Sequence, residues 1–417
     1  MIRLDEELAS IAGDPAGPLA SLSVLAMRAG RVVYTQQFGR RFISPDGPQG
    51  DRAARADTLY RIASISKLVT TLGVLKLVED GKMGLDADAS ELLGWTLRNP
   101  HFPGVRVTPR MMMSHTSSIR DEGGYNWPAN VKLRDVLEHN EAMWGREGAP
   151  GAYFSYANLP WGLLGTMVER AAGERFDRFM AKHILAPLGV DATYNAADLG
   201  VRAADRIATL YRKRTGDEGH EVWHPEGPWI AQVDDYSKGP PVSRVGDDYE
   251  IGTNATVQGP QGGLRASATH LGRVMQLLLG RGEIEGRRIL ARATVEEMLR
   301  PQWSFDGRNG NADYAVTRRR FNEWGLGNQH FLDVSGPGEG DRLVEGGGFR
   351  AVGHLGDAYG LTSCMALDPA SGDGMVFLSG GSAFDPYAQR GTWSALSRYE
   401  ERILTALHRR AIRGIDP

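Results

Sequence analysis

A serine and a lysine three residues apart, Ser64 and Lys67, stand in the stretch Arg61–Leu72. Apolar residues then recur at three- and four-residue spacing as far as Gly81, which predicts a helix ending at this glycine. Ser64 would lie in the first turn and Lys67 one turn later on the same face. A lysine with a lowered pKa could remove the proton of a serine hydroxyl. The pair predicts a nucleophile and its base, although Ser-x-x-Lys alone is common by chance.

Tyr156 and Asn158 stand two residues apart, just before a predicted helix over 160–172. In an extended segment, alternate residues point to the same side, so the phenol and the amide could enter one cleft. The phenol could move protons, and the amide could hydrogen-bond a substrate carbonyl. The alternative is structural, with the tyrosine packed at the helix start and Asn158 acting as its N-cap.

His354, Gly356 and Asp357 lie on a predicted strand near the C-terminus. Alternation along a strand places His354 and Gly356 on one side, and Leu355 and Asp357 on the other. A glycine within a strand lets a substrate backbone lie close to the sheet. A histidine on a strand is more often structural when it stands alone. A catalytic role for His354 therefore depends on the other two motifs lying close to it in the fold.

Together, in this order and at these distances, the three groups resemble the penicillin-recognising serine hydrolases. These include class C β-lactamases, D-Ala-D-Ala carboxypeptidases, D-aminopeptidases and related esterases. The resemblance covers nearly the whole chain and implies a β-lactamase-like α/β fold. The matching segments are Ser64-Ile-Ser-Lys67, Glu79–Asp86, Met113-Ser-His-Thr-Ser117, Tyr156-Ala-Asn158, Gln261-Gly-Gly-Leu264 and His354-Leu-Gly356.

The resemblance also implies roles for these residues. Ser64 would attack an amide or ester carbonyl, and Lys67 and Tyr156 would share the proton transfers, with the identity of the base left open. The backbone N–H groups of Ser64 and Asp357 would form the oxyanion hole. The full predicted site is catalytic Ser64, Lys67, Tyr156 and His354, with Asn158, Gly356 and Asp357 binding substrate and oxyanion, and with no metal or cofactor.

One departure from the family narrows the predicted substrate. β-Lactamases usually carry Lys-Thr-Gly where this chain has His354-Leu-Gly356, which removes a permanent cation and a hydroxyl that help to hold a carboxylate. We therefore rank peptidase or amidase first, carboxylesterase or acyltransferase second, and β-lactamase below them. The His-x-Gly branch resembles peptidases acting on short or unusual peptides, including D-residue-containing peptides and linearised microcystin.

Three rival interpretations need weighing. His220-Glu-Val-Trp-His224 matches the His-Glu-x-x-His pattern of zinc metallopeptidases, but Gly219 before it and Pro225 after it disfavour the helix that this pattern needs. Ser66 is adjacent to Lys67, yet neighbours on a helix diverge by roughly 100°, so Ser64 is favoured. A non-catalytic hydrolase fold is disfavoured because all the predicted catalytic residues are present.

The elements that would position these groups come from both chain ends. Residues 21–39 predict a β-hairpin, and 349–356, 359–367 and 375–379 predict strands that include a second hairpin. Helices over 4–12 and 388–412 would cover the sheet, with Trp393 facing the core. The middle of the chain predicts helices over 132–141, 160–172, 174–185 and 266–281.

This pattern predicts one antiparallel sheet built from both termini. Residues 1–81 and 290–417 would form a discontinuous α/β domain, and 82–289 an inserted helical domain. Within the insert, the stretch 212–262 is rich in Gly, Pro and Asp and is predicted to be a long loop at the edge of the substrate cleft. Clefts between domains are common ligand sites.

Composition bounds the partners and the compartment. The chain has 417 residues with a formal net charge of -3, which gives no reason to expect nucleic acid or a membrane surface. A small molecule or short peptide is the expected partner, and the oligomeric state stays open. The lone Cys364 excludes an internal disulfide. The charged start does not resemble a signal peptide, so we expect a cytoplasmic protein unless a leader has been removed.

Overall fold

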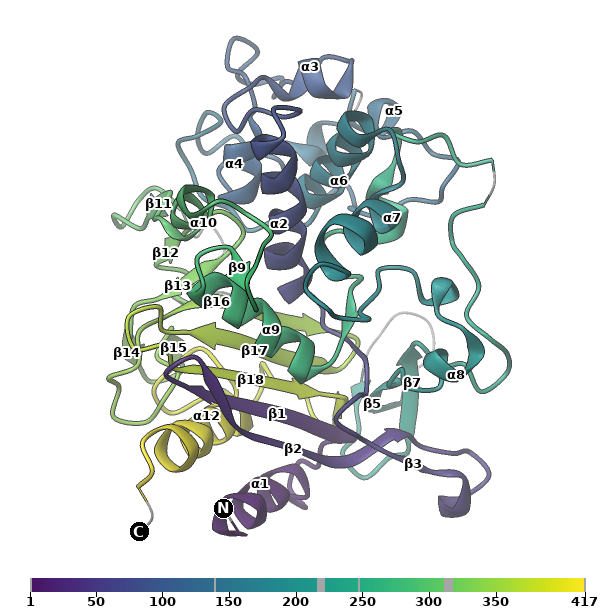
Figure 1. Cartoon of the computed structure of the whole chain (residues 1–417), viewed down its shortest axis with the longest axis vertical. Helices are drawn as coiled ribbons and strands as arrows, with labels where there is room; N and C mark the ends of the chain where they lie inside the picture. Colours follow the sequence, from purple (N-terminus) through teal and green to yellow (C-terminus); the bar gives the residue numbers. More distant parts are fainter. Residues whose placement is uncertain (1, 139, 216–221, 247, 311–317, 416–417) are drawn as a thin grey trace.

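The computed structural model describes residues 2–138, 140–215, 222–246, 248–310 and 318–415. Within these residues, nine strands form an antiparallel sheet in the order β11-β12-β13-β16-β17-β18-β1-β2-β3 (Figure 1). Their bounds are β1 Ser21–Arg28, β2 Arg31–Phe42, β3 Arg52–Ala53, β11 Trp303–Ser304, β12 Glu323–Trp324, β13 Gln329–Phe331, β16 Ala351–Ala358, β17 Leu361–Leu367 and β18 Gly374–Ser379.

The two predicted hairpins join the chain ends at the middle of this sheet. β1 pairs with β2 across a tight turn, and β17 pairs with β18. β1 then pairs with β18, with Leu22 opposite Ser379 and Val24 opposite Phe377. The expected sheet from both termini is therefore confirmed. Strands β1, β17 and β18 are buried on both faces over nearly their whole length.

Helices cover both faces of the sheet. Helices α1 (Ile2–Ala12) and α12 (Arg398–Ala406) lie on one face, and α2 (Ile65–Glu79) and α9 (Ala268–Leu279) lie on the opposite face (Figure 1). A second group of helices lies beyond α2, away from the sheet. Their bounds are α3 Ala89–Leu93, α4 Pro109–Met113, α5 Leu133–Leu137, α6 Leu159–Ala172 and α7 Phe176–Met180. Helix α8 (Val201–Ala204) lies apart from this group, and α10 (Arg292–Leu299) lies beside the sheet.

The predicted C-terminal helix over 388–412 begins ten residues later than expected. Ser397 and Glu400 form a capping box that fixes the start of α12. Glu401 accepts hydrogen bonds from the backbone N–H groups of Thr392 and Trp393, which holds the preceding segment as a loop. Trp393 is only half-buried there. After α12, a π-helical turn continues over Leu407–Ile412.

The other helix predictions differ mainly at their ends. The helix predicted over 132–141 shortens to α5, because Asn140 caps a separate 3-10 turn over Glu141–Met143. The helix predicted over 174–185 is α7 followed by a π-helical turn over Ala181–Leu185. Remaining 3-10 turns span Pro48–Gly50, Ala196–Asp198 and Ala255–Gln258.

The stretch 212–262 is not wholly a loop. Strands β5 (Leu210–Thr215) and β7 (Trp229–Val233) pair antiparallel within it, and β5 also pairs with the short strands β6 (Val222–Trp223) and β19 (Gly381–Ser382). β-branched and aromatic residues in both strands outweigh the turn residues around them. The remaining short strands are β4 Tyr60–Arg61, β8 Arg265–Ala266, β9 Glu283–Ile284, β10 Arg287–Arg288, β14 Ser335–Gly336 and β15 Glu339–Gly340.

The domain boundaries near residues 81 and 290 stay a prediction. Helix α9 belongs by sequence to the predicted insert, yet it packs on β1 and β18. Among the described residues, none of the helices is long and apolar enough to cross a membrane.

Candidate active site

Helix α2 places Ser64 and Lys67 together at its first turn. Ser64 occupies the N-cap position, and the Lys67 Nζ lies 2.9 Å from the Ser64 Oγ. The helix is buried nearly all round rather than on one face, because the sheet packs on one side and α6 and α7 pack on others. Ser66 is fully buried, and its hydroxyl accepts the backbone N–H of Leu264. This geometry excludes Ser66 from the cleft, whereas Ser64 is partly exposed and lines it.

The Lys67 ammonium lies in a fully buried cage of oxygen atoms. Besides Ser64, it donates to the Asn158 Oδ1 at 2.7 Å and to the Gln261 backbone carbonyl at 3.1 Å. Burial lowers the pKa of Lys67 to about 7, and the negative charge of Asp121 opposes this shift. Both protonation states are therefore populated near neutral pH, which suits a group that accepts and returns a proton.

The Tyr156 ring is fixed between two other rings. His115 stacks on it at a centroid distance of 4.4 Å, and Phe321 stacks on it at 5.3 Å. The Lys67 Nζ lies 4.9 Å from the Tyr156 ring centroid. Desolvation raises the pKa of Tyr156 above its ordinary value, so the phenol stays protonated at neutral pH. Tyr156 is thus a proton donor near Lys67.

His115 is a buried structural residue. Its Nδ1 accepts the backbone N–H of Ala157, and its carbonyl accepts that of Ser155. These two bonds hold the segment that carries Tyr156 in an extended form. Burial lowers the pKa of His115 well below its ordinary value, so the ring is neutral.

Asp121 orients Asn158, and the sequence analysis missed it. Its carboxylate accepts the backbone N–H groups of Asn158 and Leu159 at 2.7–2.9 Å, and so caps α6. It also accepts the Asn158 Nδ2 at 2.8 Å, which turns the Asn158 Oδ1 toward Lys67. Asn158 therefore does not cap the helix with its own side chain, contrary to the structural alternative.

Strand β16 presents His354, Gly356 and Asp357 to the start of α2. His354 is buried, and its Nδ1 lies 2.5 Å from the Leu355 carbonyl, which assigns the proton to Nδ1. Burial and the nearby Lys67 lower the pKa of His354 to about 3, so the ring is uncharged at neutral pH. A Cβ on Gly356 would lie 2.7 Å from the Ile62 carbonyl oxygen, so only glycine allows this approach of strand and helix.

The outer edge of β16 is open beside Ser64. β13 pairs only with residues 351–353 of β16, whereas β17 pairs along its whole length. The backbone N–H of Thr362 donates to the Ser379 Oγ, away from β16. In antiparallel strands, opposite residues alternate between hydrogen-bonded and non-hydrogen-bonded pairs. Asp357 lies opposite Thr362 in a non-hydrogen-bonded pair, so its N–H points away from β17 toward the open edge. The Ser64 N–H has no backbone acceptor among the described residues.

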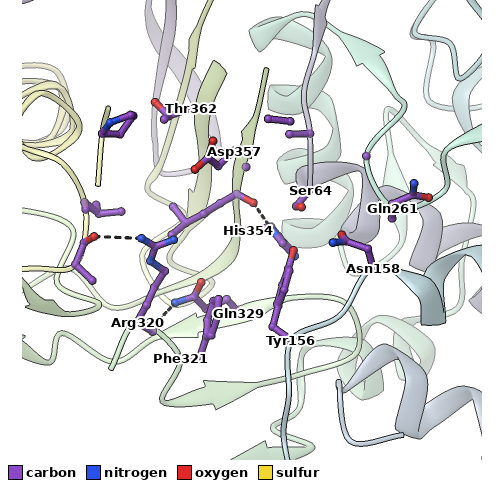
Figure 2. A pocket seen from close by; sticks show the side chains of 18 of the residues that line it. Ser64, Tyr156, Asn158, Gln261, Arg320, Phe321, Gln329, His354, Asp357 and Thr362 are labelled. Carbon is purple, nitrogen blue, oxygen red and sulfur yellow. Dashed lines mark hydrogen bonds between the residues drawn. The ribbon is translucent and has the colours of Figure 1, made fainter. Parts of the chain in front are cut away.

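These groups line one cavity of about 370 Å³. Figure 2 shows Ser64 between the strand that carries Asp357 and the side chains of Asn158 and Gln261, with Tyr156 and His354 beside it. All the predicted site residues line this cavity except Lys67, which lies beneath its floor. Arg61, Arg320 and Gln261 also line it, although the sequence predicted no role for them. Gln261 stands in the family-like segment Gln261–Leu264, whereas no local pattern marks Arg61 or Arg320 as site residues.

The structure gives no helix to the zinc pattern. Val222 and Trp223, the described residues between the two histidines, form strand β6 and not the helix that the His-Glu-x-x-His pattern needs. His220 lies outside the described residues. Within the part of the chain that the structure describes, no group of three His, Cys, Asp or Glu side chains could hold a metal ion.

The sequence model of the Beta-lactamase family matches residues 11–399. This chain belongs to the Beta-lactamase family. The family resemblance of its sequence and its expected fold are thereby confirmed.

Among curated proteins, Penicillin-binding protein 4* of Bacillus subtilis (strain 168) is 30% identical over 179 residues, which are 41% of this chain and 37% of that protein. The chain thus spans well under two thirds of this relative. A solved D-stereospecific amidohydrolase from Streptomyces sp. covers 100% of the chain and 99% of its own, with a TM-score of 0.62 and 17% identity. EstCE1, described as a hydrolase with promiscuous acyltransferase activity, covers 97% and 98%, with a TM-score of 0.64 and 20% identity. These likenesses show the fold.

Proposed function

We propose that this protein is a serine hydrolase that cleaves amide or peptide bonds of short peptides through an acyl-enzyme on Ser64. The observation that carries the proposal is the 2.9 Å contact between the Lys67 Nζ and the Ser64 Oγ, in a buried cage where the pKa of Lys67 falls to about 7. A lysine with an ordinary pKa would be almost fully protonated at neutral pH and could not accept the serine proton.

We propose Lys67 rather than Tyr156 as the base. Neutral Lys67 takes the proton of the Ser64 hydroxyl as the oxygen attacks the substrate carbonyl carbon. Tyr156 is the poorer base, because its raised pKa keeps the phenol protonated. The N–H groups of Ser64 and Asp357 then hold the oxyanion of the tetrahedral intermediate, and each such donor is typically worth about 10²–10³ in turnover.

Collapse of the intermediate needs a proton on the leaving amine. In the proposed step the Tyr156 phenol gives it and later regains a proton from the Lys67 ammonium, so the C–N bond breaks without releasing an amide anion. Water then attacks the acyl-enzyme and gives a proton to neutral Lys67. Lys67 passes this proton to the Ser64 oxygen as the ester bond breaks, which frees the acid and restores the Ser64 hydroxyl. If an alcohol or amine attacks the same acyl-enzyme in place of water, the acyl group is transferred to it and the reaction is an acyl transfer.

The neutral wall around His354 supports amides and esters over β-lactams. His354 carries no charge at neutral pH and Leu355 has no hydroxyl, so neither gives the fixed anchor for a carboxylate that Lys-Thr-Gly provides. Short or D-residue-containing peptides, linearised microcystin among them, remain the first substrate class. Support comes from the fold shared with the D-stereospecific amidohydrolase.

A carboxylesterase or acyltransferase is the second candidate, supported by the likeness to EstCE1 over nearly the whole chain. The two candidates differ in the leaving group that Tyr156 must protonate, since an aryl oxide leaves without help.

A small substrate panel tests the proposal. We expect D- or L-aminoacyl 4-nitroanilides, linear short peptides or short aryl esters to be hydrolysed by the wild type and not by Ser64→Ala. Ser304→Ala, which changes an exposed strand serine, is the matched control and should retain full activity. Turnover that survives in Ser64→Ala and disappears with a chelator would overturn the proposal.

A further inference from the structure

A second cavity of about 230 Å³ adjoins the active site. It shares Arg61 and Gln261 with the first cavity, so these two residues form a common wall. Its lining is mainly polar and includes Asn195, Tyr236 and Gln258. A polar cavity beside a nucleophile is suited to bind a polar part of the substrate rather than an apolar part.

The carboxylates that line this second cavity are already engaged. Asp234 is held in a two-point ion pair by the Nε and Nη2 atoms of Arg265, at 3.0 Å and 2.6 Å, and also accepts the Tyr236 hydroxyl. Asp177 pairs with Arg175. The exposed Asp235 accepts the backbone N–H of Ser237. These groups leave no carboxylate in contact with Arg61.

Arg61 is a buried cation without a partner. Its side chain makes no hydrogen bond or ion pair within the described residues, although the residue is only 8% exposed. Its contact is with the face of the Tyr359 ring, at 5.3 Å from the centroid. Burial and the nearby Arg265 lower the pKa of Arg61 to about 10, and the negative charge of Asp234 offsets only part of this shift. A buried unpaired charge is costly, so such a group is expected where a ligand will supply the counter-charge.

Gln261 adds a second unsatisfied group to the same wall. Its side-chain amide makes no hydrogen bond among the described residues, so the Nε2 group can donate to a carboxylate and the buried Oε1 can accept a substrate N–H. Its backbone carbonyl accepts from Lys67. The wall thus combines an unpaired guanidinium with a free amide, and its backbone is fixed against the catalytic lysine. A guanidinium is suited to a planar carboxylate, which it binds through two parallel hydrogen bonds.

Arg61 places this wall near the end of β16 that lies away from His354. Arg61 ends strand β4, three residues before Ser64, and its ring partner Tyr359 directly follows β16. A substrate lying along the open edge of β16 passes His354, then Asp357, and then reaches Tyr359 and Arg61. Asn158 and Gln261 face it from the other side of Ser64 (Figure 2).

We propose that Arg61 and Gln261 form a carboxylate-binding subsite, so that the preferred acyl donors carry an acidic group on the acyl side of the scissile bond. This inference rests on the proposed function, since it names the substrate class of the same site. It relocates the anionic anchor from the strand position of His354 to the wall between the two cavities.

Two matched substrates test it. Glutaryl 4-nitroanilide and its neutral isostere, 4-carbamoylbutanoyl 4-nitroanilide, differ only in the carboxylate. We expect the wild type to prefer the acid by about 10- to 100-fold in kcat/KM, the range of a charge-assisted bond. Arg61→Met should lose that preference and retain turnover of the neutral substrate, and Arg61→Lys should keep part of it. The exposed control Arg281→Met should keep all of it.

A binding readout separates failure of the subsite from failure of the proposed function. A fluorophosphonate should label Ser64, and glutarate should slow the labelling of the wild type more than glutaramide does. If Ser64 is not labelled, the proposed function fails. If Ser64 is labelled but glutarate and glutaramide act alike, or if the wild type shows no preference between the two anilides, the subsite is overturned. These wild-type comparisons decide the question even if Arg61→Met does not fold.

Discussion

At the scale of single residues, the protonation of Lys67 governs the proposed chemistry. Its pKa of about 7 predicts that log kcat/KM falls by one unit per pH unit below about pH 7 and reaches a plateau above it, because only neutral Lys67 can accept the serine proton. A pH profile on a substrate without ionising groups measures this limb. A limb near pH 4, or none, would point to a base other than Lys67.

Asp121 should shift that limb. Its negative charge raises the pKa of Lys67, so Asp121→Asn should move the acid limb to lower pH while the amide still orients Asn158. The measurement is the same pH profile, with Asp86→Asn as the control, because Asp86 pairs with Arg110 at the surface. An unchanged limb in Asp121→Asn would remove Asp121 from the electrostatic account.

Site residues that are close together along the chain could be predicted from the sequence, and those with distant partners could not. Ser64 and Lys67 are one helical turn apart, so periodicity alone predicts that they face each other. Asp121 reaches Asn158 across 37 residues, and the Gln261 carbonyl reaches Lys67 across 194. An aspartate that caps a distant helix, or a backbone carbonyl, leaves no periodic signal in one sequence.

At the scale of elements, the approach of β16 to α2 sets the oxyanion geometry. Gly356→Ala should place a Cβ against the Ile62 carbonyl and the Ser363 hydroxyl, forcing the strand outward. We expect kcat/KM to fall by about 100-fold or more and stability to fall by about 1–3 kcal/mol. Kinetics and thermal unfolding measure both effects. Gly104→Ala, where a Cβ meets open space, is the control, and full activity of Gly356→Ala would refute the close approach.

Elements with strong periodicity were predictable, and those shaped by distant side chains were not. The hairpins β1–β2 and β17–β18 follow from alternation and turn residues. The sequence predicts a helix for the segment before α12. The buried Glu401 carboxylate instead accepts the backbone N–H groups of this segment and holds it as a loop. The strands β5 and β7 lie in a stretch whose composition predicts a loop. They pair with each other across residues rich in turn formers, which hide the strands in the sequence.

At the scale of the whole molecule, the sheet brings the three motifs to one cavity. β1 and β18 join the chain ends, α2 lies on the sheet, and the segment before α6 closes the other side. The arrangement predicts a substrate preference. A chromogenic cephalosporin should be hydrolysed at least about 100-fold less efficiently than the best anilide or ester, because His354 is neutral and Leu355 gives no hydroxyl. Steady-state kinetics on the same preparation measures the ratio, and comparable efficiency would contradict this account of the His-Leu-Gly strand.

The measurement that tests the central claim most directly is the mass of the covalent intermediate. Rapid quenching with an activated ester, followed by peptide mapping, should find the acyl group on Ser64. We expect Lys67→Met to slow its formation by about 10²–10⁴ and Ser64→Ala to abolish it. An acyl group mapped to Ser66, or turnover that continues in Ser64→Ala, would contradict the assignment of Ser64 and Lys67 as nucleophile and base.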